Sequence, residues 1–424
     1  MKITSISLKK SLSFLLAAAF FAGIFISCGD TPASGNQVIN VPDAEAGDFE
    51  PAATSVQMAK NMAIGWNLGN TLDATNWENK TNAGISTEQE WGMPKTTEAM
   101  ITAIKNAGFK TIRIPVSWHN HITETTNYTI DTAWMARVKE IVDWAYNKNM
   151  CVIINIHHDN LKNSELTGNI GFAISYDENK QTQSKTYIAK IWTQIATTFA
   201  SYDNRLVFEV LNEPRDVDGE VANNEWNCTD ENIMDIITSY EQAGINAIRL
   251  VSGNANRFIM VPGYAASGSN PQMLDAYTMP TDSATDRLLL STHAYSPYNF
   301  AMNDMTDTVF GDNDKASLDY IFSYLKSNYT DKGIGVVMGE ASATDKENLS
   351  ERVSWATYYF TKAKEAGIPV VLWDNMVTEA NEDKNKINIG ERHGYYDRNA
   401  NTWYFPTMIQ AMMKAVYGDN YTGK

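Results

Sequence analysis

Cysteine is scarce in this chain, which has three cysteines among 424 residues. Only Cys151 and Cys228 lie beyond the N-terminal region, and Cys151 begins an apolar run, so we expect no disulfide framework. The sequence also lacks CxxC and HExxH spacing, which are the common signatures of zinc sites. Stability is therefore expected to come from the hydrophobic core, and the sequence predicts neither a metal nor a cofactor.

Basic residues are also relatively few. The chain has 34 Lys and Arg but 50 Asp and Glu, which gives a formal net charge of -16. A protein with this excess of negative charge repels polyanions, so nucleic acid is not expected as a partner. A neutral substrate is easier to accommodate.

Residues 1–28 have the pattern of a secretory signal, in which lysines precede the uncharged stretch "SLSFLLAAAFFAGIFISC". The end of this stretch, "FISC", resembles the lipobox of bacterial lipoproteins, in which Cys28 carries the lipid. An uncleaved anchor helix is the alternative, since the stretch approaches the ~18 apolar residues of a spanning helix. Residues 29–53 are rich in Gly, Pro, Ala, Ser and acidic residues and are expected to form a flexible tether. We expect export, with a lipid anchor at the cell surface or in the periplasm of a bacterium.

Residues 54–424 contain eight short apolar runs enriched in β-branched residues, and no linker-like stretch interrupts them. Continuous hydrophobicity within a run is typical of parallel strands buried on both faces. The runs are "AIGWNLG" from Ala63, "TIRIPVSW" from Thr111, "CVIINIHHD" from Cys151, "LVFEVLNEP" from Leu206, "RFIMVPGYA" from Arg257, "LLLSTHAY" from Leu288, "GVVMGEAS" from Gly335 and "VVLWDNM" from Val370. Helical patterns lie between most of them, as in the stripe formed by Trp134, Val138, Ile141, Val142 and Ala145. This alternation predicts an α/β fold, a single (β/α)8 TIM barrel.

The predicted connections are unequal in length. Links from helix to strand are short, such as "NAGFK" and "EAGIP", whereas links from strand to helix are long, at about residues 71–95, 160–183, 215–230, 296–313 and 377–402. Barrel enzymes build their sites on the loops at the C-terminal ends of the strands, so the long loops indicate the functional face. An open doubly wound sheet is the competing architecture, but no GxGxxG follows a strand to support it.

Polar side chains recur where the predicted strands end, on seven of the eight strands. In a barrel these ends converge on one pocket. The candidate site residues are Asn70, Arg113, His157, His158, Asn212, Glu213, His293, Tyr295, Glu340 and Trp373. A structural role explains any one of them alone, but their joint appearance favours a catalytic pocket.

Glu213 and Glu340 are the two carboxylates of this set, at the ends of the fourth and seventh predicted strands. A pair about 5–5.5 Å apart hydrolyses glycosides with retention, because one carboxylate attacks the anomeric carbon while the other protonates the leaving oxygen and later deprotonates water. Arg113 and Tyr295 are expected to hold Glu340 ionised, which leaves Glu213 to carry the proton with a raised pKa. Asn212 is expected to bind a sugar 2-hydroxyl, and the histidines to orient carboxylates or sugar hydroxyls.

Metal-dependent hydrolysis is the alternative use of this cluster, because His157, His158, Asp159 and His293 are plausible ligands. Barrel metallohydrolases usually begin with HxH on the first strand, where this chain has "GWNLGN". Adjacent histidines on a strand also point to opposite faces, so we expect no metal site here.

Tryptophans on or near the long-loop face complete the pattern, since aromatic rings stack on the apolar faces of sugars. They are Trp77, Trp91, Trp118, Trp226, Trp373 and Trp403. Trp373 lies directly at a strand end and is the strongest candidate, whereas packing under the loops explains Trp91 and Trp403 at least equally well.

From Asn61 to about Trp403 the chain resembles glycoside hydrolase family five of clan A, and it looks most like the bacterial endoglucanase and xyloglucanase branch. Seven motifs carry the resemblance, in order along the chain: "GWNLGNTLDA", "IRIPVSWHNH", "INIHHD", "FEVLNEPR", "HAYSPYNF", "MGEA" and "LWDN". The resemblance implies that Glu213 is the acid/base and Glu340 the nucleophile. It also implies that sugar is bound by Asn70, Asp73, Arg113, His157 or His158, Asn212, His293, Tyr295 and Trp373.

We therefore expect a monomeric, retaining endo-β-1,4-glucanase that cleaves internal bonds of cellulose-like β-glucan or xyloglucan by double displacement. Within the enzyme class, the alternative is an endo-β-mannanase or a mixed-linkage glucanase with the same apparatus. Outside it, the alternative is a non-catalytic surface glycan-binding protein.

Overall fold

The computed structural model of the protein describes residues 51–76, 82–166, 170–222, 224–302, 307–379, 391–418 and 421. The predicted signal segment with Cys28, the tether up to residue 50 and Trp77 lie outside the described residues. Within them, no helix combines the length and the hydrophobicity needed to cross a membrane. Cys151 and Cys228 are both buried free thiols.

Eight strands of the described chain close into a parallel barrel, in the order β1-β2-β5-β6-β7-β8-β9-β10 with β10 pairing back to β1. The strands are β1 (Ile64–Asn67), β2 (Thr111–Ile114), β5 (Cys151–Asn155), β6 (Leu206–Glu209), β7 (Ile259–Val261), β8 (Leu288–His293), β9 (Gly335–Ala341) and β10 (Val370–Leu372). Each predicted apolar run contains one of them. The predicted (β/α)8 TIM barrel is therefore confirmed.

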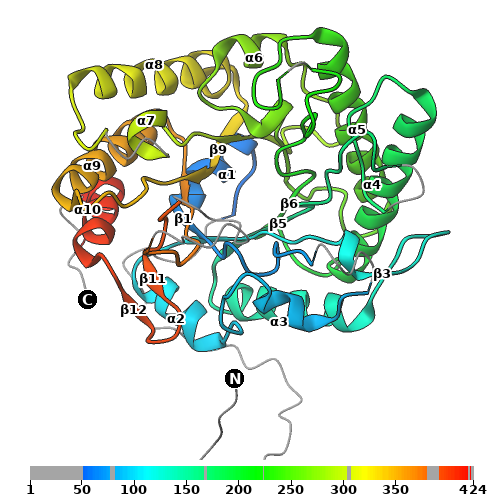
Figure 1. Cartoon of the computed structure of the whole chain (residues 1–424), viewed down its shortest axis with the longest axis horizontal. Helices are drawn as coiled ribbons and strands as arrows, with labels where there is room; N and C mark the ends of the chain where they lie inside the picture. The colour runs from blue at the N-terminus through cyan, green and yellow to red at the C-terminus, as the bar shows by residue number, and fades with distance from the viewer. Residues whose placement is uncertain are drawn as a thin grey trace, which may run out of the picture. The chain divides into compact units, whose positions relative to one another are not determined.

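Helices surround the strands (Figure 1). They are α1 (Ser55–Met62), α2 (Glu98–Asn106), α3 (Thr132–Tyr146), α4 (Glu178–Thr198), α5 (Glu231–Leu250), α6 (Pro271–Ala276), α7 (Tyr298–Ala301), α8 (Asp312–Asn328), α9 (Leu349–Glu365) and α10 (Pro406–Tyr417). The predicted stripe of α3 is buried, and the Asp131 side chain caps its first turn.

Helix α4 begins earlier than the sequence pattern suggested. Residues 160–183 were predicted as a loop, but the helix starts at Glu178, because the Asp177 side chain accepts a hydrogen bond from the Asn179 amide at 2.8 Å. This cap satisfies an amide that the first helical turn leaves unpaired, so the helix extends into a polar stretch without an apolar stripe.

Two short antiparallel hairpins lie on the connections that leave the C-terminal ends of the strands. One pairs β3 (Ile122–Glu124) with β4 (Thr129–Ile130) after β2, and the other pairs β11 (Tyr396–Asp397) with β12 (Thr402–Trp403) after β10. The predicted long loops are therefore partly ordered by local strand pairing.

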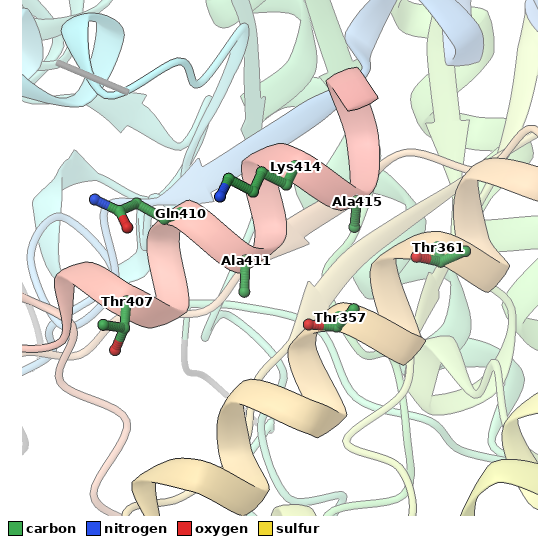
Figure 2. A pocket seen from close by; sticks show the side chains of 7 residues that line it. All are labelled: Thr357, Thr361, Thr407, Gln410, Ala411, Lys414 and Ala415. Atoms are coloured by element: carbon green, nitrogen blue, oxygen red, sulfur yellow. The ribbon is translucent and has the colours of Figure 1, made fainter. Parts of the chain in front are cut away.

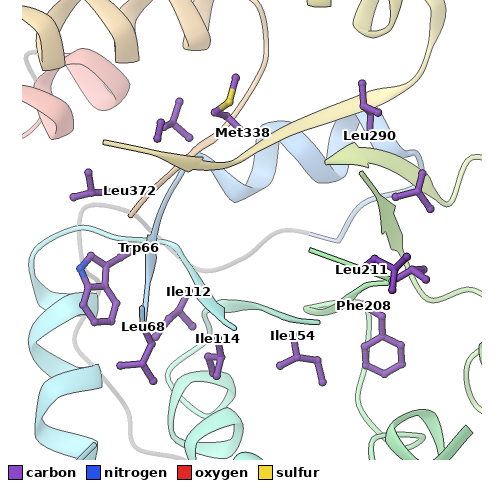
Figure 3. Packing of buried hydrophobic residues seen from close by; sticks show 14 of the residues in the cluster. Trp66, Leu68, Ile112, Ile114, Ile154, Phe208, Leu211, Leu290, Met338 and Leu372 are labelled. Carbon is purple, nitrogen blue, oxygen red and sulfur yellow. The ribbon is translucent and has the colours of Figure 1, made fainter. Parts of the chain in front are cut away.

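The hydrophobic core has two layers, one outside and one inside the barrel wall. Outward side chains such as Ile112, Ile154 and Phe208 point from the strands toward the helices (Figure 3). Inward side chains near the N-terminal ends of the strands, such as Ile153 and Val207, pack against methionines of α1. Helix α1 is tied there because the Gly335 amide donates to Ser55 Oγ at 3.0 Å. Apolar residues therefore fill the barrel interior near the N-terminal ends of the strands.

Gly244 sets how closely α5 packs against α4 and against Val210, the residue after β6, because a Cβ there would lie 2.5 Å from Val210 Cγ1 and 3.2 Å from Trp192 Cδ1. Replacing Gly244 with Ala is expected to lower the free energy of unfolding by about 1–3 kcal/mol through overpacking. This loss is expected although Ala favours an isolated helix over Gly by about 1 kcal/mol. Chemical denaturation of both proteins measures the difference.

A Val210→Ala background provides the control, because it removes the methyl that the new Cβ meets. The loss caused by Gly244→Ala should be smaller in that background. An equal loss in both backgrounds, or no loss in either, would contradict the close packing.

Candidate active site

The inward side chains change from apolar to polar toward the C-terminal half of the barrel. Because side chains alternate along a strand, the inward residues after Ile153 and Val207 are Asn155 and Glu209. The resulting polar layer consists of Asn67, Arg113, Asn155, Glu209 and Ser291, all of them fully buried. Of these, the sequence analysis singled out only Arg113. The missed signal was a charged residue, Glu209, inside an otherwise apolar run.

Arg113 lies at the centre of this layer and joins four acceptors. Its Nε donates to Glu209 Oε2 at 2.8 Å, its Nη1 to Glu340 Oε1 at 2.7 Å and to Asn67 Oδ1 at 3.0 Å, and its Nη2 to Asn212 Oδ1 at 2.6 Å. Burial opposes the charge of Arg113, but the two carboxylates outweigh it and raise its pKa. The guanidinium therefore stays charged and fixes both carboxylates at defined positions.

Glu209 is a counter-ion with few remaining acceptor sites. Besides Arg113, its oxygens accept from Asn155 Nδ2 at 2.9 Å and from Ser291 Oγ at 2.5 Å. Because its hydrogen bonds are to protein groups and it is fully buried, Glu209 stabilises the charge of Arg113 and is not exposed to a ligand.

Glu340 has both oxygens engaged by donors. Its Oε1 accepts from Arg113, and its Oε2 accepts from Tyr295 Oη at 2.7 Å. These are the two contacts expected from the sequence. Burial and the neighbouring Glu340 raise the pKa of Tyr295 well above its usual range, so the phenol keeps the proton that it donates. The carboxylate is thus oriented at the barrel mouth within β9, as a nucleophile requires.

Glu213 lies in the turn that follows β6 rather than at the end of the strand, because the ladder of β6 ends at Glu209. Its Oε1 is 2.7 Å from His293 Nδ1. One oxygen of Glu213, one oxygen of Glu340 and one ring nitrogen of His293 all lie within 4.8 Å of one another. This spacing suits the carboxyl pair of a retaining glycosidase, about 5–5.5 Å apart, and not an inverting pair at about 6.5–9.5 Å.

The expected raised pKa of Glu213 is wrong for the free site. Burial raises the pKa of Glu213, but the hydrogen bond and charge of His293, together with Arg215, outweigh burial and lower it. Burial likewise disfavours the charge of His293, but Glu340 and Glu213 outweigh it and raise the pKa of His293. The proton of the resting site is therefore shared by a Glu213–His293 pair and lies on the imidazole side.

Three further predicted site residues have different hydrogen-bonding roles at the barrel mouth. They are Asn212, Asn70 and Asp73. Arg113 occupies Asn212 Oδ1, which leaves the Asn212 amide group as a donor for a sugar hydroxyl. Asn70 has a φ of 57° and a buried Nδ2 without a hydrogen-bond partner among the described residues. Asp73 is fully buried, accepts from the amides of Asn70 and Thr71 at 2.9 and 2.6 Å, and has a pKa raised to about 7 by burial. Asp73 therefore shapes the loop that presents Asn70.

The two adjacent histidines do not point to opposite faces as expected, because β5 ends at Asn155 and both lie beyond the strand. Their ring centroids are 4.4 Å apart, and the His157 ring is parallel to the Trp373 ring at 6.1 Å. Burial lowers the pKa of both histidines, that of His158 to about 4, so both are neutral donors or acceptors. Trp373 thus lies at the barrel mouth beside His157.

Asp73, His157 and His158 also form a group whose potential ligand atoms lie within 4.8 Å of one another. Several of the potential ligand atoms in this group already take part in hydrogen bonds within the protein. The Asp73 oxygens accept from two backbone amides, and His157 Nδ1 is 3.1 Å from Asn155 Nδ2. The absence of a metal stays a prediction.

The remaining predicted tryptophans divide into packing and surface residues. Trp118 is fully buried, and Trp403 packs against Phe109 with ring centroids 5.7 Å apart. Trp91 donates to the Thr75 carbonyl at 3.2 Å and approaches the His158 ring at 5.5 Å. Trp226 is 54% exposed. Trp91 and Trp226 therefore remain candidates for sugar contact, whereas Trp118 is part of the core and Trp403 packs against it.

A groove of about 420 Å³ lies between α9 and α10 and is separate from these residues (Figure 2). It is lined by Thr357, Thr361, Thr407, Gln410, Ala411, Lys414 and Ala415. This lining holds one titratable side chain and no carboxylate, so the groove offers no acid/base pair.

The chain is similar to a known family over most of its length. The family model described as cellulase (glycosyl hydrolase family 5) matches residues 72–379. Endoglucanase A of Clostridium longisporum is 38% identical over 408 residues, which are 95% of this chain and 72% of that protein. The cellulase/esterase CelE of Acetivibrio thermocellus is 38% identical over 363 residues, but the chain spans only 40% of its length.

Solved structures show the same similarity. A GH5-4 broad specificity endoglucanase from Ruminococcus champanellensis with bound cellotriose superposes with a TM-score of 0.77 at 37% identity, covering 86% of this chain and 99% of that chain. A glycoside hydrolase 5 lichenase from Caldicellulosiruptor in complex with cellotetraose superposes with a TM-score of 0.75 at 36% identity, covering 86% of this chain and 96% of that chain.

The Glu213–His293 pair predicts a specific pH dependence. Because the pKa of His293 is raised above 6.5, the pair keeps its proton below that raised value and loses it as the pH rises further. Replacing His293 with Asn keeps a donor near Glu213 but removes the titrating ring. The alkaline limb of kcat/KM on an oligosaccharide is expected to move to lower pH, which initial rates across a pH series measure.

Dinitrophenyl β-cellobioside is the control substrate, because its leaving group departs without a proton. Neither the wild type nor His293→Asn should show the alkaline limb with it. An alkaline limb at the same pH in both proteins on the oligosaccharide would show that His293 does not share the proton.

Proposed function

The chain belongs to glycoside hydrolase family 5, and from this we propose that it cleaves internal β-1,4 bonds of cellulose-like glucans or xyloglucan, with Glu340 as nucleophile and Glu213 as acid/base. The protein is an endo-β-glucanase of the cellulase type, and the retaining mechanism is general in this family. The observation that carries the residue assignment is the approach of the Glu213 and Glu340 oxygens to within 4.8 Å.

In the first step, the Glu340 carboxylate forms a bond to the anomeric carbon while the bond from that carbon to the glycosidic oxygen breaks. The leaving oxygen takes from Glu213 the proton that Glu213 shares with His293 across their 2.7 Å contact, and Glu213 is left as a carboxylate. In the second step, water attacks the anomeric carbon, gives its proton to Glu213 and releases Glu340. The two steps together retain the anomeric configuration.

Arg113 and Tyr295 act on the charge of Glu340. They stabilise the carboxylate before attack and again when it leaves in the second step, because both donors are already in place. The Asn212 amide is oriented by Arg113 to donate to a sugar hydroxyl, a contact that strengthens as positive charge develops on the sugar ring.

Mixed-linkage β-glucan is the second candidate substrate. The observation that favours it is the similarity to the Caldicellulosiruptor lichenase, which shares 36% identity over 86% of this chain. Cellulose-like glucan and mixed-linkage glucan both contain β-1,4-linked glucosyl runs, so one set of sugar contacts serves both.

We further propose that the protein is exported and lipid-anchored through Cys28, and that it acts as a monomer. The charged start, apolar stretch and "FISC" end of residues 1–28 support the anchor. No binding partner other than the polysaccharide is proposed.

The function is tested by release of reducing sugar from carboxymethyl-cellulose, xyloglucan, lichenan and glucomannan. The wild type is expected to act on at least one β-1,4-glucan. Replacing Glu340 with Gln removes the nucleophile and should lower kcat by several orders of magnitude while glycan binding, measured by calorimetry, remains.

Glu365→Gln is the matched control, because Glu365 lies on α9 with an exposed side chain and, among the described residues, forms an ion pair with Lys362 alone. It should leave kcat unchanged. Glycan binding without product from any polymer would instead support the non-catalytic glycan-binding protein, and glucomannan as the only substrate would support a mannanase.

A further inference from the structure

Arg398 is a second fully buried arginine, and it lies outside the polar layer around Arg113. It follows directly after β11. Its Nη1 donates to the Gly69 carbonyl at 2.8 Å and to Thr71 Oγ1 at 2.7 Å, and its Nη2 donates to the Asp374 carbonyl at 2.6 Å. One side chain therefore joins the loop after β1 to the loop after β10.

The charge of Arg398 is balanced at a distance and not by a direct ion pair. Burial lowers the pKa of Arg398, and the charges of Asp374 and Asp73 oppose that shift. The Asp374 carboxylate is itself occupied, because it accepts from Trp66 Nε1 and from the Tyr396 amide, both at 2.9 Å. The guanidinium is thus left to donate to uncharged oxygens of the two loops, an arrangement suited to fixing the backbone.

The two carbonyls that Arg398 joins belong to residues that support Trp373. Trp373 directly precedes Asp374, and its ring lies against Gly69. A Cβ on Gly69 would lie 3.0 Å from Trp373 Cζ2 and 2.9 Å from the Asp374 carbonyl oxygen. Asn70 follows Gly69 and has a buried Nδ2 without a hydrogen-bond partner among the described residues. Arg398 therefore sets the distance between Trp373 and the loop that presents Asn70.

Trp373 and Asn70 lie on the nucleophile side of the barrel mouth. The Trp373 amide donates to the Ala341 carbonyl at 3.0 Å, one residue beyond Glu340. In the closed strand order β10 neighbours β9 and lies opposite β6, the strand that leads to Glu213. Glu340 attacks the anomeric carbon, whereas Glu213 protonates the leaving oxygen. The sugar that is attacked therefore lies toward Trp373 and Asn70.

We propose that Arg398 is a positioning residue for the glucosyl residue that undergoes attack, because it fixes the separation of Asn70 and Trp373. This inference rests on the proposed function. The planar fork of a guanidinium reaches acceptors on both loops in one fixed geometry, which the single ammonium of Lys cannot reproduce. Small shifts matter here, since a misplacement of about 1 Å lowers an enzymatic rate about 100-fold.

Arg398→Lys tests this role, because it keeps the charge and removes the fork. The substrate is dinitrophenyl β-cellobioside, whose two glucosyl residues both lie on the attacked side of the cleaved bond. The variant is expected to lower kcat/KM roughly tenfold to a hundredfold. In a Trp373→Ala background the same change should lower kcat/KM by a factor at least about threefold smaller, because the ring that Arg398 positions is already absent.

Arg257→Lys is the matched control, because Arg257 is also buried and also donates to backbone carbonyls, at the other end of the barrel. Its partners include the carbonyls of Leu206 at 2.8 Å and Phe199 at 3.0 Å, and Leu206 begins β6. Both Lys variants are expected to lower the free energy of unfolding, measured by chemical denaturation. In assays at a temperature where all the proteins are folded, Arg257→Lys should leave kcat/KM unchanged.

Thr71→Val is the milder variant if Arg398→Lys does not fold. It removes one acceptor of Arg398 and nearly keeps the shape of the side chain. It should lower kcat/KM in the same direction by a smaller factor, and this loss should also shrink in the Trp373→Ala background.

The proposed function and the positioning role fail differently. A wild type that hydrolyses neither the aryl cellobioside nor any glucan would overturn the proposed function and the role of Arg398 with it. If the wild type is active, a folded Arg398→Lys protein with unchanged kcat/KM would overturn the positioning role alone. Losses that agree within about threefold in the two backgrounds would do the same, because they would show that Arg398 does not act through Trp373.

Discussion

The site depends on one buried cation held between two carboxylates. Arg113 is fully enclosed by the barrel, where an unpaired charge costs several kcal/mol, and Glu209 on one side and Glu340 on the other offset that cost. Glu209 stabilises the cation from within the polar layer, so Glu340 can face the barrel mouth without leaving Arg113 unbalanced. The fixed guanidinium also orients Asn212. Removing it would leave two buried carboxylates unpaired, a loss of about 3–5 kcal/mol in comparable cases.

The barrel separates stability from chemistry along its axis. Near the N-terminal ends of the strands, Ile153 and Val207 pack with α1 in a dry core, and two residues later the same strands present Asn155 and Glu209 to the polar layer. The strand period of two places these side chains on the same inner surface. Residues beyond the strands, such as Glu213, are then positioned by turns that start from this rigid wall.

The sequence predicted the barrel, its eight strands and the residues at the mouth, because short apolar runs and the polar groups that end them are local signals. It placed Arg113 and Tyr295 on Glu340, since strand ends in a barrel must converge. It did not predict the direction of the Glu213 pKa, which depends on His293, a residue 80 positions away that contacts Glu213 at 2.7 Å. Glu209 was missed because its strand was treated as one continuous apolar run. The side chains that face the barrel interior were not considered separately from those that face the helices. The pairing of His157 with His158 was misjudged because the end of β5 could not be located to within two residues.

The central claim is that Glu340, held by Arg113 and Tyr295, forms the covalent bond to the sugar. Mass spectrometry of the protein treated with a 2-deoxy-2-fluoro cellobiosyl fluoride measures this directly, because the fluorine slows release of the glycosyl-enzyme intermediate. The account predicts one added glycosyl group, located by peptide mapping on Glu340. A label on another residue, or a wild type that turns over glucan but never acquires a label, would contradict it.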